Sequence, residues 1–163
     1  MEIKTFKDMY IAELQELLSM ETQLGDTLKR AADAASHPSL KDALTRHCME
    51  TRQQGDRVRS ILQKRGADGE LHTDQAMQAL IGEAEKMMRI LQTDDLRDAG
   101  LIASAQKIEH YEIAAYGSAA ALAGQLDLRE DQTELHAILE EEKRADKLLS
   151  ELAKSEVNQD AAA

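Results

Sequence analysis

Four long stretches of the chain place apolar residues three and four positions apart, the spacing that keeps side chains on one face of an α-helix. This spacing predicts helices over about 5–34, 38–64, 95–126 and 130–152. Strong helix formers such as Ala, Leu, Glu, Lys and Gln dominate these stretches, whereas aromatic residues make up only 2 % of the chain. We therefore predict an all-α fold.

The breaks between the predicted helices indicate how they connect. Ser36, Pro38 and Ser39 end the first helix and start the second after a short turn, which predicts an antiparallel hairpin. A second short break, at about 127–131, predicts another hairpin. Residues 66–93 are too many for a turn, and apolar spacing over 73–91 predicts a helical crossover. Two hairpins joined by one long crossover form a ferritin-like four-helix bundle.

Composition and charge narrow the class further. We expect a single ferritin-like domain over residues 1–155, with 156–163 as a flexible C-terminal tail. A net charge of −11 argues against nucleic-acid partners and against binding to anionic membranes. One cysteine leaves no intrachain disulfide, and neither a signal peptide nor an apolar membrane-spanning run is visible. These features predict a soluble cytoplasmic protein.

Acidic side chains interrupt the apolar stripe of every long helix near its middle. The candidates, in chain order, are Glu13, then Glu50 with His47 and Gln54 beside it, then Glu109 and Glu112, then Glu142 and Asp146. A buried charge costs several kcal/mol unless it is paired or bound to a metal. Antiparallel packing would bring the middles of the helices together, so we predict that the carboxylates bind two divalent metal ions. Ion pairs or a water-filled core are the alternative.

Three further residues near these stripes receive other interpretations. Tyr10 and Tyr116 lie one turn from Glu13 and Glu112, and we predict that they pack in the core, with hydrogen bonds to ligating carboxylates as the alternative. Glu21 lies near the edge of the first stripe and is interpreted as a boundary residue.

The segments around the candidate ligands resemble the YciE/YciF family, a bacterial ferritin-like group linked to stress responses. The similar segments are 10–15, 47–51, 108–117 and 140–146, and Glu109-His110-Tyr111-Glu112 is the most specific of them. The resemblance implies a ferritin-like fold and a role in the stress response.

The layout is also similar, more distantly, to rubrerythrin. That resemblance implies a Glu from the first helix, Glu-x-x-His from the second and fourth, and Glu-x-x-Glu from the third. Its carboxylates match Glu13, Glu50, Glu109, Glu112 and Glu142. Its histidines are missing, because Gln53 and Ala145 stand at those positions. Helical phase favours His47 and Gln54 as replacements on the second helix and Asp146 on the fourth.

Three functions remain open from the sequence, and the least favoured is iron storage in a cage-forming shell, because no nucleation-site signature is visible. The first is a dinuclear iron or manganese protein that reduces peroxide or oxygen during stress, an oxidase- or peroxidase-type activity for which no catalytic residue is assigned. The second is a non-enzymatic structural stress protein whose metal is structural or absent. Because few imidazoles are available, magnesium or calcium would also suit the oxygen-rich ligands. We expect a homodimer, with peroxide as the small-molecule partner of the first function.

Overall fold

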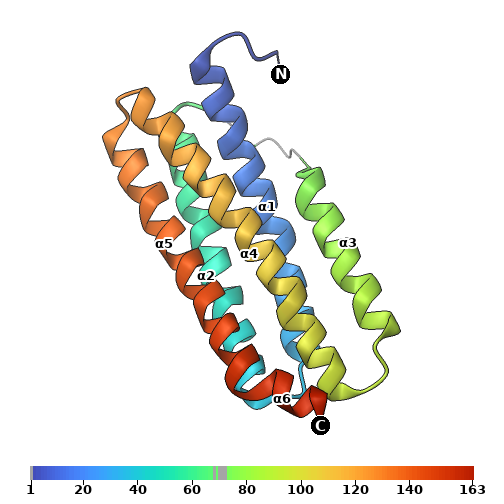
Figure 1. Cartoon of the computed structure of the whole chain (residues 1–163). Helices are drawn as coiled ribbons and strands as arrows, with labels where there is room; N and C mark the ends of the chain where they lie inside the picture. Colours follow the sequence, from blue (N-terminus) through green and yellow to red (C-terminus); the bar gives the residue numbers. More distant parts are fainter. Residues whose placement is uncertain (1, 68, 70–72) are drawn as a thin grey trace.

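The computed structural model describes residues 2–67, 69 and 73–163, and all regular structure in this part of the chain is helical. The long helices are α1 (Phe6–Ala34), α2 (Pro38–Lys64), α3 (Gln75–Ile90), α4 (Asp94–Gln125) and α5 (Arg129–Leu152). Figure 1 shows α1, α2, α4 and α5 side by side as a bundle, with α3 on its outside. The predicted ferritin-like bundle with a helical crossover is confirmed.

Local side-chain chemistry sets the helix boundaries. Thr5 and Asp8 form a capping box at the start of α1, in which each side chain accepts a hydrogen bond from the other residue's backbone N–H. Pro38 begins α2, where its missing N–H costs nothing. Gly66, with a φ of 69°, follows the end of α2 in the left-handed conformation that glycine adopts without strain.

Buried polar contacts fix the two hairpins to each other at both ends of the bundle. At one end, Asp98 of α4 accepts hydrogen bonds from the backbone N–H groups of Ser36 (2.9 Å) and His37 (2.7 Å) in the α1–α2 turn. At the other end, Asp131 of α5 accepts a hydrogen bond of 2.9 Å from the Tyr10 hydroxyl and pairs with the guanidinium of Arg65. Both carboxylates are buried, so these contacts fix the relative positions of the helices.

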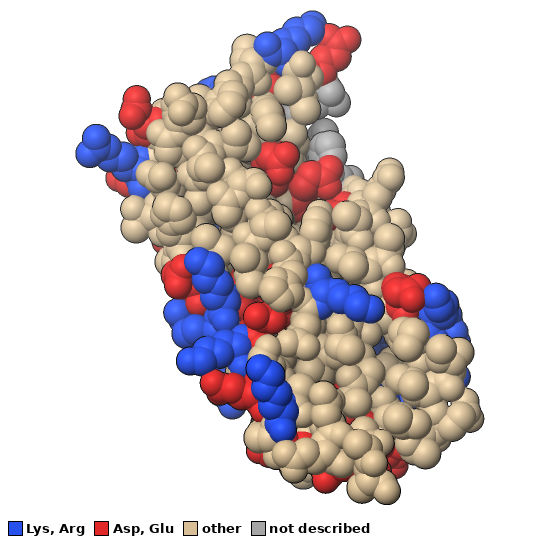
Figure 2. Space-filling model, viewed as in Figure 1, with Lys and Arg blue, Asp and Glu red and all other residues tan. Residues whose placement is uncertain are grey.

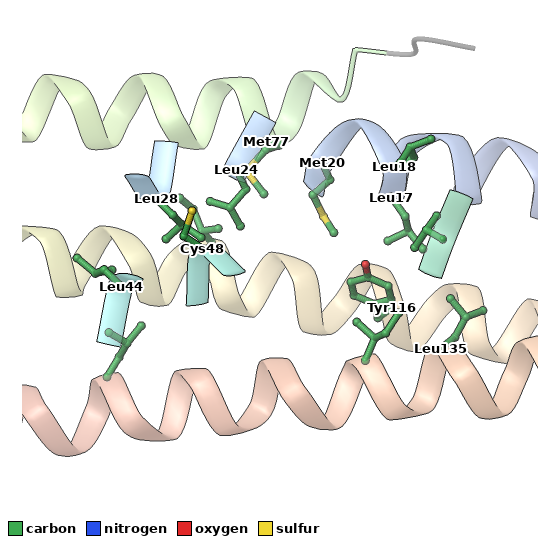
Figure 3. Packing of buried hydrophobic residues seen from close by; sticks show 14 of the residues in the cluster. Leu17, Leu18, Met20, Leu24, Leu28, Leu44, Cys48, Met77, Tyr116 and Leu135 are labelled. Atoms are coloured by element: carbon green, nitrogen blue, oxygen red, sulfur yellow. The ribbon is translucent and has the colours of Figure 1, made fainter. Parts of the chain in front are cut away.

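Apolar side chains from every long helix meet in one core. Charged side chains are interspersed over the outer surface (Figure 2), whereas the interior is filled by Leu, Ile, Met, Ala and two tyrosines. Figure 3 shows this packing, with Leu24 of α1, Leu44 of α2, Met77 of α3, Tyr116 of α4 and Leu135 of α5 among the labelled residues. Both tyrosines, Tyr10 and Tyr116, are fully buried, as predicted.

The crossover helix α3 is held to the bundle by buried Met77, by polar contacts of Asp74, and by partly buried apolar side chains that pack against the core. Met77 is its one buried residue in the described part of the chain and is completely inaccessible to solvent. Asp74 caps α3 by accepting a hydrogen bond from the Met77 N–H, and it also accepts one of 2.7 Å from the Tyr111 hydroxyl of α4. The crossover therefore packs against α1 and α4.

The C-terminal residues are helical where the sequence predicts a tail. A π-helical turn, Ala153–Val157, leads into a short helix α6, Asn158–Ala162. Val157 is 1 % exposed, and the Ser39 hydroxyl at the start of α2 donates a hydrogen bond of 3.1 Å to Glu156. Residues 156 and 157 thus contribute contacts to the end of the bundle, because Val157 continues the apolar stripe of α5.

Candidate metal centre

Helix α4 places two carboxylates in the middle of the bundle. Glu109 and Glu112 are three residues apart, so they share one face of the helix. Their exposed fractions are 1 % and 0 %. This burial follows from the bundle, because the same face of α4 also carries Ile108 and Tyr116 into the core.

Helices α2 and α5 complete a cluster around this pair. His47 of α2 and Glu142 of α5 are both buried, and one ligand-type atom from each of the four residues lies within 4.8 Å of the others. Nε2 of His47 is 2.8 Å from Oε1 of Glu109 and 3.9 Å from Oε2 of Glu142. We call His47, Glu109, Glu112 and Glu142 the core cluster.

Helix α1 faces the core cluster with Glu21. This side chain is 3 % exposed, and one of its oxygens accepts a hydrogen bond from the Tyr116 hydroxyl. Its negative charge helps to raise the pKa of Glu112. Each of the four bundle helices therefore presents at least one ligand-type side chain to the same region.

Three of these carboxyl groups, those of Glu21, Glu112 and Glu142, have raised pKa values. Burial, opposed by the Tyr116 hydrogen bond, raises the pKa of Glu21 to about 8. Burial raises the pKa of Glu142 to about 9 and that of Glu112 well above its usual value, with repulsion from neighbouring carboxylates adding to both shifts. Burial alone would lower the pKa of His47, but attraction to Glu109 raises it well above its usual value. The site thus has an unusual surplus of buried acids.

Several acceptor atoms of these acids have no donor. Both carboxylate oxygens of Glu112 are buried without a hydrogen-bond partner among the described residues, and so is Oε2 of Glu21, of Glu109 and of Glu142. Buried polar atoms are almost always hydrogen-bonded, so converging acceptors without donors indicate a place for a cation. Carboxylate oxygens with one imidazole form a donor set that fits iron or manganese.

The structure brings some of the predicted ligands together and places others at the edge. His47, Glu109, Glu112 and Glu142 form the core cluster. Gln54, which is 1 % exposed, donates hydrogen bonds to both Glu142 and Glu141 and thereby orients the Glu142 carboxylate.

Glu50 and Asp146 lie at the periphery of the core cluster. Oε2 of Glu50 is 3.8 Å from Nδ1 of His47, and the Glu50 side chain is 44 % exposed. Asp146 points its Oδ1 toward His110, 3.6 Å from that imidazole's Nε2. The Asp146 side chain is 22 % exposed, and its Oδ1 is buried without a hydrogen-bond partner among the described residues.

Glu13 is not brought to the core cluster, which corrects the prediction for the first helix. It lies eight residues before Glu21, about 12 Å along α1, and burial together with the carboxylates of Glu16 and Asp74 raises its pKa. Spacing alone does not separate the two residues, because Glu13 follows buried Tyr10 by three and precedes buried Leu17 by four, just as Glu21 follows Leu17 by four and precedes Leu24 by three. What differs is their level along α1, and only Glu21 lies at the level of the core cluster.

Two cavities reach the side chains of the centre. One, of about 370 Å³, lies between α1 and α2 and is lined by Glu21, Thr51 and Gly55. It has room there because Gly55 lacks a Cβ, which would stand 3.3 Å from the Glu21 Cβ. The other, of about 200 Å³, lies between α2 and α5 and has His47 in its wall. Small solutes therefore have space next to the centre on two sides.

Taken together, the two hairpins, the helical crossover and the buried cluster define a ferritin-like protein with a carboxylate-rich candidate metal centre. No helix in the described part of the chain combines the length and apolar character needed to cross a bilayer.

Comparison with known proteins identifies the family. Residues 5–162 match the family described as Domain of unknown function (DUF892), and the chain belongs to this family. It is 39 % identical to Protein YciF of Escherichia coli K12 over 165 residues, covering 99 % of this chain and 98 % of that protein. The family resemblance seen in the sequence is confirmed.

Solved structures show the same fold. The crystal structure of the E. coli stress protein YciF superposes with a TM-score of 0.91 at 39 % identity, covering 96 % of this chain and 99 % of that one. YcfI from Rhodopseudomonas palustris, which is labelled a structural protein, gives a TM-score of 0.89 at 31 % identity, covering 91 % and 95 % of the two chains. A protein from Xanthomonas campestris shares the fold at 20 % identity, with a TM-score of 0.75 over 93 % and 92 %.

Proposed function

We propose that this protein binds two divalent metal ions, iron or manganese, in the middle of the bundle. The residues that would hold them are the core cluster together with Glu21. The observation that carries the proposal is the set of buried carboxylate oxygens without hydrogen-bond donors, with Glu112 lacking a partner for both of its oxygens among the described residues.

Charge balance supports two ions rather than one. Glu21, Glu109, Glu112 and Glu142 would carry four negative charges when ionised, and His47 is neutral when it binds a metal through Nε2. Two divalent ions would balance these charges in a region from which water is largely excluded. A single ion would leave two buried carboxylates to be neutralised by protons.

The protein's own side chains would orient this centre. The Tyr116 hydroxyl holds one oxygen of Glu21, and Gln54 holds one oxygen of Glu142, so each of these carboxylates directs its remaining oxygen inward. A redox-active metal bound there would supply electrons for the reduction of peroxide or oxygen, in keeping with a role in stress.

A structural role for the metal is the second candidate. It is favoured by the ligand set, which contains one imidazole where redox-active carboxylate bundles use two, and by the structural-protein label of the Rhodopseudomonas relative. In that case the ions would stabilise the bundle by neutralising the acids, and turnover of peroxide would not exceed that of the free metal.

The test begins with metal content and thermal stability. Protein purified without chelator is expected to contain about two equivalents of iron or manganese by mass spectrometry. Metal added to the chelator-treated protein at about 100 times its Kd is expected to raise stability by about 2.7 kcal/mol. The Glu109→Gln/Glu112→Gln variant should lose both effects, whereas Glu13→Gln, a matched change outside the centre, should keep them.

The outcomes separate the candidates. Stoichiometric metal with peroxide turnover above that of free metal supports the redox role, and stoichiometric metal without turnover supports the structural one. Absence of bound metal in the isolated protein, with no change in Tm on adding iron or manganese, would refute metal binding itself. Gel filtration of the same samples checks the expected homodimer.

A further inference from the structure

A second feature next to the core cluster is the cavity of about 200 Å³ between α2 and α5. Its floor is apolar, formed by Leu44 of α2 and by Leu148 and Leu149 of α5. It exists because small residues, Ala43 and Ala145, stand where larger side chains would fill the space. A cavity of this volume limits any organic ligand to a small one.

Two arginines without ion-pair partners stand at this cavity. Arg46 and Arg144 line it, both are exposed, and neither forms a hydrogen bond or a salt bridge with any described residue. Two acids, Glu50 and Glu141, also line the cavity, and Glu141 pairs with Arg57. Figure 2 shows Lys and Arg side chains gathered over the C-terminal half of α5 on the visible face. The two guanidinium groups therefore have no hydrogen-bonded partner among the described residues, although the Glu50 carboxylate in the same wall attracts both of them.

The inner wall offers a buried hydrogen-bonding atom. Nδ1 of His47 is buried and stands 3.8 Å from Oε2 of Glu50, which is an ion-pair separation longer than a hydrogen bond. The His47 imidazole and the charges of Arg46 and Arg144 lower the pKa of Glu50, and all four residues line the same cavity. An oxyanion that took the place of the Glu50 carboxylate would meet the same three groups.

We propose that this cavity is a binding site for a small organic anion, a monocarboxylate with a compact apolar body. The carboxylate lies between Arg46 and Arg144 and accepts a hydrogen bond from Nδ1 of His47, while the apolar body packs on the leucine floor. Glu50, which is half exposed, swings outward to make room. The arginines and the apolar floor do not depend on a metal, so the proposal stands or falls separately from the proposed function.

Benzoate is a suitable probe, because it combines one carboxylate with a compact apolar ring. It would be titrated into metal-free protein in the presence of chelator, with binding followed by calorimetry and by ¹H–¹⁵N NMR shifts. We expect saturable binding, with shifts concentrated at the α2 and α5 residues that line the cavity. The Arg46→Gln/Arg144→Gln variant should bind at least tenfold more weakly, since it removes both positive partners and leaves the core untouched.

Matched controls test whether binding depends on this cavity and on the carboxylate of the ligand. Arg52→Gln, which removes an arginine from the α1–α2 cavity, should leave benzoate binding unchanged. Ala145→Leu should fill the cavity and abolish binding, and circular dichroism would verify that each variant is folded. Neutral benzamide and inorganic phosphate should each bind much more weakly than benzoate. Binding that is not saturable, that survives the double arginine change, or that is equalled by benzamide or phosphate would overturn the proposal.

Discussion

Replacing Glu21 by glutamine is expected to stabilise the metal-free protein near neutral pH while leaving its stability near pH 5 almost unchanged. The carboxyl group is buried, and its pKa is raised to about 8 from an ordinary value of 4.5. Between these two values the unfolded chain has released the proton that the folded chain retains. The folded state then binds more protons, so the free energy of unfolding falls as the pH rises through this window.

The size of the effect follows from the same window. Near pH 7 the folded state is destabilised by about 3 kcal/mol, because its Glu21 carboxyl group must keep a proton that the unfolded chain has released. This corresponds to about 6–12 °C in Tm for a chain of this length. Glutamine does not titrate, and its amide oxygen can still accept the hydrogen bond from the Tyr116 hydroxyl. The variant should therefore avoid the loss at neutral pH without opening a cavity. The pKa values of Glu112 and Glu142 are also raised, so the free energy of unfolding of the variant should still fall with rising pH, but less steeply.

Urea unfolding in chelator, followed by far-UV circular dichroism between about pH 5 and pH 8, measures this directly. Wild-type stability should fall with rising pH, and Glu21→Gln should fall less steeply. Glu13→Gln on the same helix is the matched control and should depart from the wild type less than Glu21→Gln does, because Glu13 is only partly buried. The reasoning is refuted if wild-type stability is constant or rises over this range, or if the two variants have equal slopes.

Three further substitutions test the contacts that hold the bundle together, each measured by chemical unfolding against the wild type. Asp131→Ala leaves the Arg65 guanidinium without its buried partner and should cost about 3 kcal/mol; a loss below about 1 kcal/mol would show that solvent compensates Arg65. Asp98→Ala leaves two backbone N–H groups of the α1–α2 turn unpaired and should cost about 2–3 kcal/mol, with Asp95→Ala, an exposed neighbour, as the control. Met77→Ala removes the buried anchor of α3 and should cost about 2–5 kcal/mol. It should also speed amide hydrogen exchange in α3 more than in α5, and uniform acceleration would contradict this role.

Most of the architecture could be predicted because its determinants are local. The apolar spacing of three and four residues defines each long helix over its whole length, and Pro38 and Gly66 mark where α2 starts and ends. The length of 66–93 excludes a tight turn and so implies the crossover. The C-terminal helix was missed because α6 has no buried residue of its own and only Val157, just before it, reaches the core.

The candidate site was only partly predictable. Glu109, Glu112 and Glu142 interrupt apolar stripes at the right phase, and Glu112 and Glu142 are each fifteen residues from Asp127 in the α4–α5 turn. The same count in the first hairpin places Glu21 level with Thr51, each fifteen residues from Ser36, and places Glu13 well above Glu50. Choosing Glu13 therefore neglected its level in the hairpin.

The sequence by itself determined the helices, their order and the presence of acids on buried stripes, because these depend on spacing along one chain. Only the tertiary structure decided which acids meet. A helix rises about 1.5 Å and turns about 100° per residue, so small differences in level and phase separate a shared centre from an isolated carboxylate. The packing of four helices sets those levels, and it brings Glu21 rather than Glu13 to face His47, Glu109, Glu112 and Glu142.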